Sequence, residues 1–120
     1  MKKVLIVDDE PNILLSLEFI VQKSGYSVAT AQDGEAALEK IKDWSPDLVL
    51  LDINMPKLDG FEVCQLLRED SRWNALKIIM LTAKGRQVER EKGLALGADD
   101  YITKPFSTQD VINKISVLLS

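Results

Sequence analysis

Five side chains that could hold a metal ion or a phosphoryl group follow directly after short apolar runs. They are Asp8 and Asp9 after V-L-I-V, Asp52 after L-V-L-L, Thr82 after I-I-M-L and Lys104 after Y-I-T. Three carboxylates can share a small site only when positive charge neutralises them, and a divalent cation with one ammonium group would do so. Because the chain has no histidine and one cysteine, its oxygen ligands favour Mg²⁺, which also binds phosphate.

A site with these residues would bind an anionic phosphoryl group as its remaining partner. The metal and Lys104 would hold two phosphoryl oxygens, and the Thr82 hydroxyl could hold a third. Asp52 would be the nucleophile, because a carboxylate can attack phosphorus to give an aspartyl phosphate. Taken singly, Asp8 or Asp9 could cap the next helix, Thr82 could lie in a turn and Lys104 could be solvated. Asp52 is the exception, since nothing in I-N-M-P-K-L-D-G makes it a helix cap.

Five apolar runs predict the strands that position these side chains. They lie at 4–7, 27–31, 47–51, 77–81 and 100–103, and three are continuously apolar, which is typical of strands covered on both faces. Helical patterns lie between the runs, so we expect an α/β fold with a doubly wound parallel sheet and helices on both faces. Ligands of such sheets bind beyond the carboxyl ends of the strands, where the five side chains would meet.

The helical patterns carry signals for their ends and their buried sides. Gly25 suits the end of the first helix, and Asp33 and Ser107 suit the N-caps of the second and fifth. The inward-facing residues expected in the third helix, over 60–69, are Val63, Leu66 and Leu67. The fourth helix, over 86–96, has few large apolar residues and an internal Gly93, so it is either mobile or packed through small residues.

Composition limits the kind of protein this can be. The 120 residues suit one domain, with 46% hydrophobic and 28% charged residues. The net charge of -4 argues against direct nucleic-acid binding and against an anionic membrane surface. The lone Cys64 forms no internal disulfide, and the first apolar run ends at Asp8, too early for an export signal. We therefore expect a cytoplasmic protein without a membrane span.

The candidate residues lie in four longer motifs, V-D-D-E-P, L-D-I-N-M-P-x-L-D-G, L-T-A and Y-I-T-K-P-F. Together these motifs resemble the receiver domain of two-component response regulators, and the resemblance covers the whole chain. It implies a flavodoxin-like three-layer (βα)₅ sandwich with strand order 2-1-3-4-5, in which the first and fifth helices share one face. It also implies that residues 1–120 form one phosphoacceptor domain, with any C-terminal effector domain outside this chain. Such a domain is no enzyme beyond its own phosphoryl transfer and dephosphorylation.

The resemblance implies a role for each residue that matches a family motif. Asp52 matches the phosphoacceptor, Lys104 the lysine that pairs with the phosphoryl group, and Asp9 and Asp8 the direct and water-mediated ligands of Mg²⁺. The Asn54 backbone carbonyl matches a further metal ligand, and Ala83 matches the small residue beside the phosphoryl group. Lys84 and Asn54 match positions that affect how fast the acyl phosphate hydrolyses. Pro105 matches a proline whose bond to the preceding lysine, here Lys104, is cis in the family.

The resemblance also implies a switch and a set of partners. Phosphorylated Asp52 would draw Thr82 towards it, and Tyr101 would fill the space, changing the surface of the fourth helix, fifth strand and fifth helix. The donor would be a sensor histidine kinase or a histidine phosphotransfer protein, and the changed surface would act on an output partner or effector domain that the sequence does not name. The residues expected at the kinase-docking surface are Asn12, Ile13, Leu15, Ser16, Pro105 and Phe106.

The oligomeric state stays open in the sequence. The stretch A-D-D-Y-I-T-K-P-F-S resembles receivers that carry a winged-helix DNA-binding domain and dimerise through the switch surface. Those receivers tend to have two basic residues in the fifth helix, where this chain has Lys114 and Ser116. Asp99, Asp100, Arg90 and Lys114 could still pair across an interface, so both a monomer and a phosphorylation-dependent homodimer fit the residues.

Two other functions share parts of this pattern. A Mg²⁺-dependent phosphatase of the haloacid dehalogenase type forms an aspartyl phosphate on a similar sheet, but it needs D-x-D. Here the stretch is Asp52-Ile53-Asn54, and asparagine cannot transfer the proton. A flavodoxin-type flavin carrier would need a phosphate loop rich in hydroxyl groups and glycine after the first strand, where this chain has D-D-E-P.

Overall fold

The structure is a computed structural model that describes residues 1–120. Its strands are β1 (Lys3–Val7), β2 (Ser27–Ala31), β3 (Leu48–Asp52), β4 (Lys77–Ala83) and β5 (Asp100–Lys104). Its helices are α1 (Pro11–Lys23), α2 (Gly34–Trp44), α3 (Gly60–Arg68), α4 (Gln87–Ala95) and α5 (Thr108–Leu119), with a short 3₁₀ helix η1 (Ser71–Trp73). None of the helices combines the length and the apolar composition that crossing a membrane requires.

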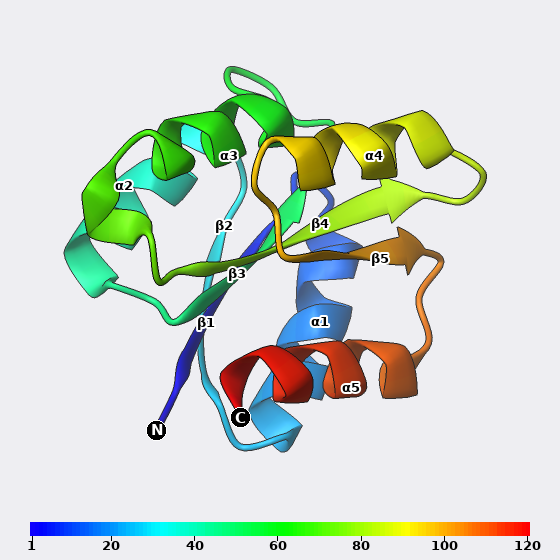
Figure 1. The fold of residues 1–120 in the computed structure, drawn as a ribbon. Helices are drawn as coiled ribbons and strands as arrows, with labels where there is room; N and C mark the ends of the chain where they lie inside the picture. The colour runs from blue at the N-terminus through cyan, green and yellow to red at the C-terminus, as the bar shows by residue number, and fades with distance from the viewer.

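The five strands form one parallel sheet in the order β2-β1-β3-β4-β5. Helices α1 and α5 cover one face of the sheet, and α2, α3 and α4 cover the other (Figure 1). The predicted fold class, strand order and division of the helices are therefore confirmed.

Two apolar layers explain why the central strands have no polar position before their ends. In β1, Leu5 and Val7 pack into the layer under α2 and α3, whereas Val4 and Ile6 pack into the layer under α1 and α5. All four side chains are fully buried, and each contributes about 1.5–3 kcal/mol relative to an exposed position. A strand with both faces covered must be continuously apolar, so a charge at its end requires a separate reason.

The predicted helix ends are confirmed. The Asp33 side chain accepts a hydrogen bond from Ala36 N at 2.7 Å, and the Ser107 hydroxyl accepts one from Asp110 N at 3.0 Å. Gly25 follows the end of α1 with a φ of 96°, a conformation in which a side chain would be strained.

The prediction that Leu66 faces the core is wrong, because its side chain lies on the solvent side of α3. Leu66 is 45% exposed, whereas Val63, Cys64 and Leu67 are buried. Successive residues of a helix are rotated by about 100°, so the buried stripe centred on Val63, Cys64 and Leu67 leaves Leu66 at its margin. The buried position belongs to Cys64, which the apolar pattern did not single out.

Helix α4 is packed through a small residue, one of the two possibilities that its composition allowed. Gly93 is buried, and a Cβ atom added there would lie 3.0 Å from Met80 Cγ on β4. The glycine therefore lets the helix approach the sheet closely where a larger residue would hold it away. Mobility of this helix stays a prediction.

Candidate functional site

The carboxyl ends of β1, β3 and β5 bring Asp8, Asp52 and Lys104 into contact. Lys104 Nζ donates hydrogen bonds to Asp8 Oδ2 at 2.7 Å and to Asp52 Oδ1 at 3.1 Å. The Asp8 side chain is fully buried, and the side chains of Asp52 and Lys104 are 7% and 19% exposed. Two acids and one amine that are distant in the sequence thus form a single buried ion-paired group.

The strands extend further than the sequence analysis placed them. Asp52 pairs with Leu81 and Lys104 pairs with Ala83, so β3, β4 and β5 include the polar residues that were expected just beyond them. The sheet register therefore holds the backbone of Asp52, Thr82 and Lys104. A side chain attached to a paired strand is positioned more firmly than one on a free loop.

The loop after β3 is shaped to let α3 begin close to Asp52. Gly60 N donates a hydrogen bond to Ile53 O at 2.8 Å, and a Cβ atom at Gly60 would overlap with the Asp52 carbonyl oxygen. Asp59 and Glu62 form a reciprocal capping box at the same helix end. Glycine is therefore required where the helix approaches the backbone of Asp52, a constraint that the sequence analysis did not identify.

Burial and neighbouring charges shift the pKa values of Asp52 and Lys104. Burial, followed by the Asp8 charge, raises the pKa of Asp52 from 3.8 to about 6, although Lys104 opposes the rise. Burial alone would lower the pKa of Lys104, but its hydrogen bond to Asp8 and the charge of Asp52 outweigh burial and raise it above 10.5. At neutral pH, Lys104 is therefore charged and Asp52 is mostly ionised.

A group of acidic side chains adjoins this pair. Asp8, Asp9 and Glu10 each offer a carboxylate oxygen, and these atoms lie within 4.8 Å of one another. Asp8 is buried, whereas Asp9 and Glu10 are exposed and form no ion pair. Glu10 was not among the candidate residues predicted from the sequence, and its position directly after two aspartates was the signal that could have found it. Asp8 and Asp52 already outnumber the one ammonium group that they contact, and Asp9 and Glu10 add carboxylate oxygens beside Asp8. This excess of oxygen ligands fits a hard divalent cation.

Asp8 also accepts a hydrogen bond from the backbone that leads into α1, which agrees in part with the possibility that it caps this helix. Its Oδ1 accepts a hydrogen bond from Glu10 N at 2.9 Å, but the N-cap position itself is occupied by Glu10. One carboxylate therefore both supports the helix start and pairs with Lys104.

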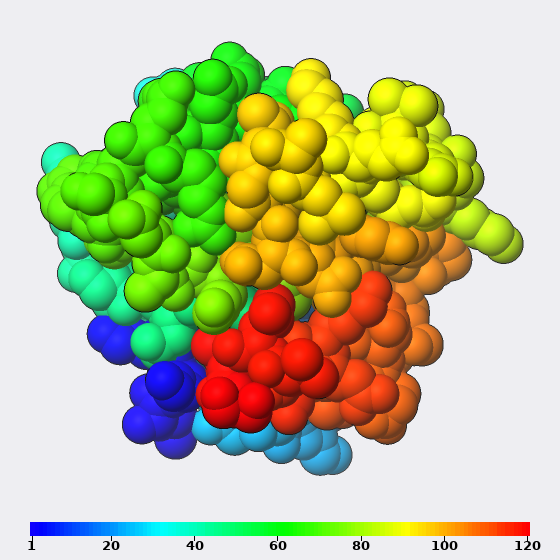
Figure 2. All heavy atoms as spheres, in the orientation of Figure 1, coloured from blue at the N-terminus to red at the C-terminus, as the bar shows by residue number.

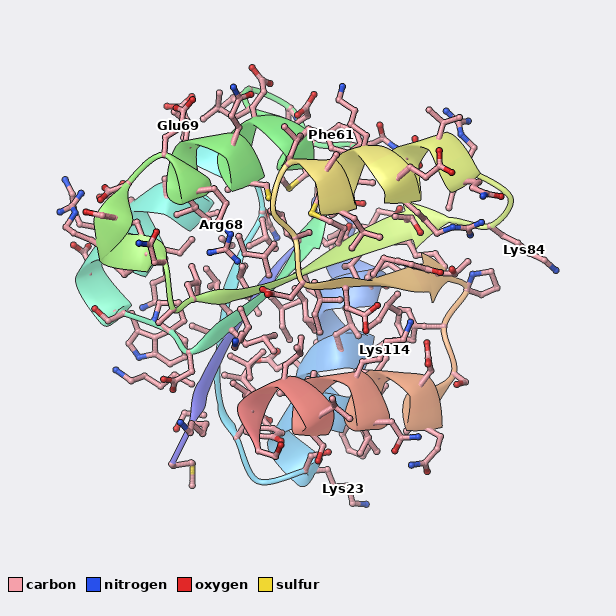
Figure 3. All side chains as sticks on the ribbon, viewed as in Figure 1. Lys23, Phe61, Arg68, Glu69, Lys84 and Lys114 are labelled. Carbon is pink, nitrogen blue, oxygen red and sulfur yellow. The ribbon has the colours of Figure 1, made fainter.

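The remaining candidate residues differ in how deeply they are buried. Thr82 is 1% exposed, and its Oγ1 has no hydrogen-bond partner within the protein, whereas most buried polar atoms have one. Ala83 and Asn54 are exposed, and Lys84 extends into solvent (Figure 3). The peptide bond between Lys104 and Pro105 is cis, as the resemblance implied. Tyr101 lies further back on β5 and is half-buried.

Comparison with known families decides what kind of domain carries this site. The family model of the response regulator receiver domain matches residues 4–116. The chain belongs to the response regulator receiver domain family. Because this match covers nearly the whole chain, the receiver domain is a signalling domain, and neither the haloacid dehalogenase-type phosphatase nor the flavin carrier is supported.

Individual relatives agree with this assignment. The receiver domain is 48% identical to the alkaline phosphatase synthesis transcriptional regulatory protein PhoP of Bacillus subtilis (strain 168), over 98% of this chain and 48% of that protein. It is 52% identical to the probable transcriptional regulator ycf27 of Guillardia theta, over 98% of this chain and 45% of that protein. The receiver domain thus spans about half the length of these curated relatives.

Solved structures share the fold over nearly the whole chain. A putative response regulator from Chloroflexus aurantiacus J-10-fl has a TM-score of 0.95 at 35% identity, covering 98% of this chain and 97% of that one. The chemotaxis response regulator CheY4 of Vibrio cholerae has a TM-score of 0.92 at 34% identity, covering 98% of both chains. The receiver domain therefore shares its overall architecture with these solved structures.

Proposed function

We propose that this receiver domain accepts a phosphoryl group on the Asp52 carboxylate in a Mg²⁺-dependent reaction. The observation that carries the proposal is the Lys104 bridge between Asp52 and Asp8, with its two hydrogen bonds in a buried site. A structural ion pair needs one acid for one amine. Here a second acid and the unpartnered Thr82 hydroxyl gather at the same end of the sheet.

The donor would be a phosphohistidine of a sensor kinase or a histidine phosphotransfer protein. An Asp52 carboxylate oxygen forms a bond to phosphorus while the phosphorus–nitrogen bond breaks, and the imidazole leaves with the bonding pair and takes up a proton. A carboxyl group with a pKa of about 6 is roughly nine-tenths ionised at pH 7, so most molecules carry the nucleophilic form. Hydrolysis of the acyl phosphate would return the domain to its starting state.

The metal would be held by Asp8, Asp9, Asp52 and the backbone carbonyl of Asn54. Mg²⁺ at this position would supply positive charge beside the incoming phosphoryl oxygens. Lys104 would hold another phosphoryl oxygen, Thr82 would donate its free hydroxyl hydrogen to a third, and Ala83 would leave room for the group. Lys84 and Asn54 are exposed at the rim, where they would affect the access of water.

The output would come from the α4, β5 and α5 surface. We propose that Thr82 moves towards phosphorylated Asp52 and that Tyr101 turns inward, which biases an existing equilibrium between two conformations. The kinase would dock on α1, where Leu15 is 66% exposed beside the exposed Asn12 and Ser16, and on Pro105 and Phe106 after β5. The output partner would be an attached effector domain or a separate protein in the cytoplasm. A phosphorylation-dependent homodimer stays a prediction, since Lys114 lies 3.8 Å from both Asp100 and Asp110 of its own chain.

Incubation with acetyl phosphate and Mg²⁺ tests the proposed function. The intact mass of the domain should rise by one phosphoryl group, and chelation of the metal should prevent the rise. Asp52→Asn should remain unmodified, whereas the exposed control Asp43→Asn should be modified like the parent domain. An unchanged parent mass, or equal modification of Asp52→Asn, would contradict the proposal.

A further inference from the structure

The ring of Tyr101 lies within cation–π distance of two cations that come from different helices. Arg90 Cζ on α4 is 5.3 Å from the ring centroid, and Lys114 Nζ on α5 is 4.7 Å from it. Both helices contribute to the face shown in Figure 2, and Figure 3 labels Lys114 on the side of α5 that faces β5. A cation over an aromatic face is attracted by the electron density of the ring.

The two cations are held in different ways. Lys114 Nζ donates a hydrogen bond to the backbone oxygen of Tyr101 and lies near Asp100 and Asp110, so its position is fixed by several contacts. The Arg90 side chain makes no hydrogen bond and no ion pair, and its guanidinium group lies over the Tyr101 ring. Arg90 is therefore the cleaner residue to change, because removing its charge leaves no acid unpaired.

We propose that Arg90 and Lys114 are positioning residues that hold Tyr101 in its half-exposed place and so oppose the inward turn that phosphorylation favours. The inference rests on the proposed function, because it concerns the same switch. If the ring turned inward, it would lose its contacts with both cations, so each contact stabilises only the outward conformation. A ligand that favours the inward state must overcome this bias, and its apparent affinity is reduced by the same factor.

The test is the affinity for beryllofluoride, a phosphoryl analogue that binds carboxylates reversibly, in the presence of Mg²⁺. The ¹⁹F signal of the bound complex gives the concentration at half saturation. Arg90→Met should bind about two- to fivefold more tightly than the parent domain, the factor expected for one partly exposed cation–π contact. Arg90→Lys keeps a cation and should bind as the parent does.

A matched control comes from the same helix. Lys92 Nζ lies 4.4 Å from the Phe61 ring, so Lys92→Met removes one charge and one cation–π contact of α4 without touching Tyr101. Its affinity should equal that of the parent. In a Tyr101→Leu background the gain from Arg90→Met should vanish, because the double-mutant cycle isolates the contact with the ring.

The possible results separate the two proposals. Three results would overturn the proposed restraint on Tyr101 while leaving the phosphoacceptor assignment intact. They are an Arg90→Met affinity equal to that of the parent, a gain in affinity that persists in the Tyr101→Leu background, and an equal gain in Lys92→Met. A parent domain that binds no beryllofluoride, or binds it equally well as Asp52→Asn, would overturn the phosphoacceptor assignment and with it this inference.

Discussion

Replacing Lys104 with methionine is expected to lower the free energy of unfolding by about 3 kcal/mol at pH 8 without metal. The amine pairs with two carboxylates whose side chains are 0% and 7% exposed, and its removal leaves both without a counter-charge. This expected loss of unfolding free energy is at the lower end of what removing one partner of a buried ion pair costs. The reason is that Lys104 is itself 19% exposed and that a carboxylate left without its partner can take up a proton.

The expected loss depends on pH in a specific direction. Lys104 lowers the pKa of Asp52, so the variant should hold the Asp52 proton to higher pH and recover stability as pH falls from 8 to 5. Lys104 of the parent stays charged over this window, since its folded pKa is raised above 10.5. Urea unfolding at several pH values measures both effects. Lys84→Met, which removes an exposed lysine near the same site, should unfold like the parent, and an equal loss there would contradict the assignment to the ion pair.

Asp52→Asn is expected to stabilise the metal-free domain by about 3 kcal/mol at pH 7.5. The pKa of Asp52 is raised from 3.8 to about 6, so between these values the folded state binds more protons than the unfolded chain. The stability of the parent therefore falls as pH rises through this window. Asparagine has no such cost and can still accept a hydrogen bond from Lys104, so its advantage should be complete above pH 6 and absent below pH 3.8.

Thermal or urea unfolding in the presence of a chelator measures this advantage. Adding Mg²⁺ should reverse it, because the ion stabilises only the form that binds it, by about 1.4 kcal/mol for each tenfold excess over the dissociation constant. Asp43→Asn, an exposed acid away from the site, serves as the control and should show neither effect. A destabilised Asp52→Asn, or an advantage that is the same at pH 3.5 and 7.5, would contradict the electrostatic description of the site.

The sequence predicted those features that depend on local pattern. Continuous apolar runs between amphipathic segments indicated a sheet covered on both faces, and Asp33 and Ser107 indicated helix starts because a cap requires only nearby backbone atoms. The candidate residues could be proposed because parallel strands all end at one edge. The motifs around Asp52 then identified the family directly.

The remaining features depend on contacts between distant residues. No local pattern shows that Lys104 reaches both Asp8 and Asp52, or that Gly60 must lie against the Asp52 carbonyl. Leu66 was misplaced because an apolar residue at the margin of a helical stripe can face either way, and the sheet and neighbouring helices decide. The cations around Tyr101 likewise come together only once α4 and α5 are placed beside β5.

Reductive trapping of the phosphorylated domain measures the central claim at a single residue. Borohydride converts an aspartyl phosphate into homoserine, and peptide mass spectrometry locates the change. After treatment with acetyl phosphate and Mg²⁺, homoserine should occur at position 52 and at no other aspartate, and it should be absent when Mg²⁺ is chelated. Homoserine at Asp8, Asp9 or a distant aspartate, or none at position 52 in a domain whose mass has increased, would show that Asp52 is not the phosphoacceptor.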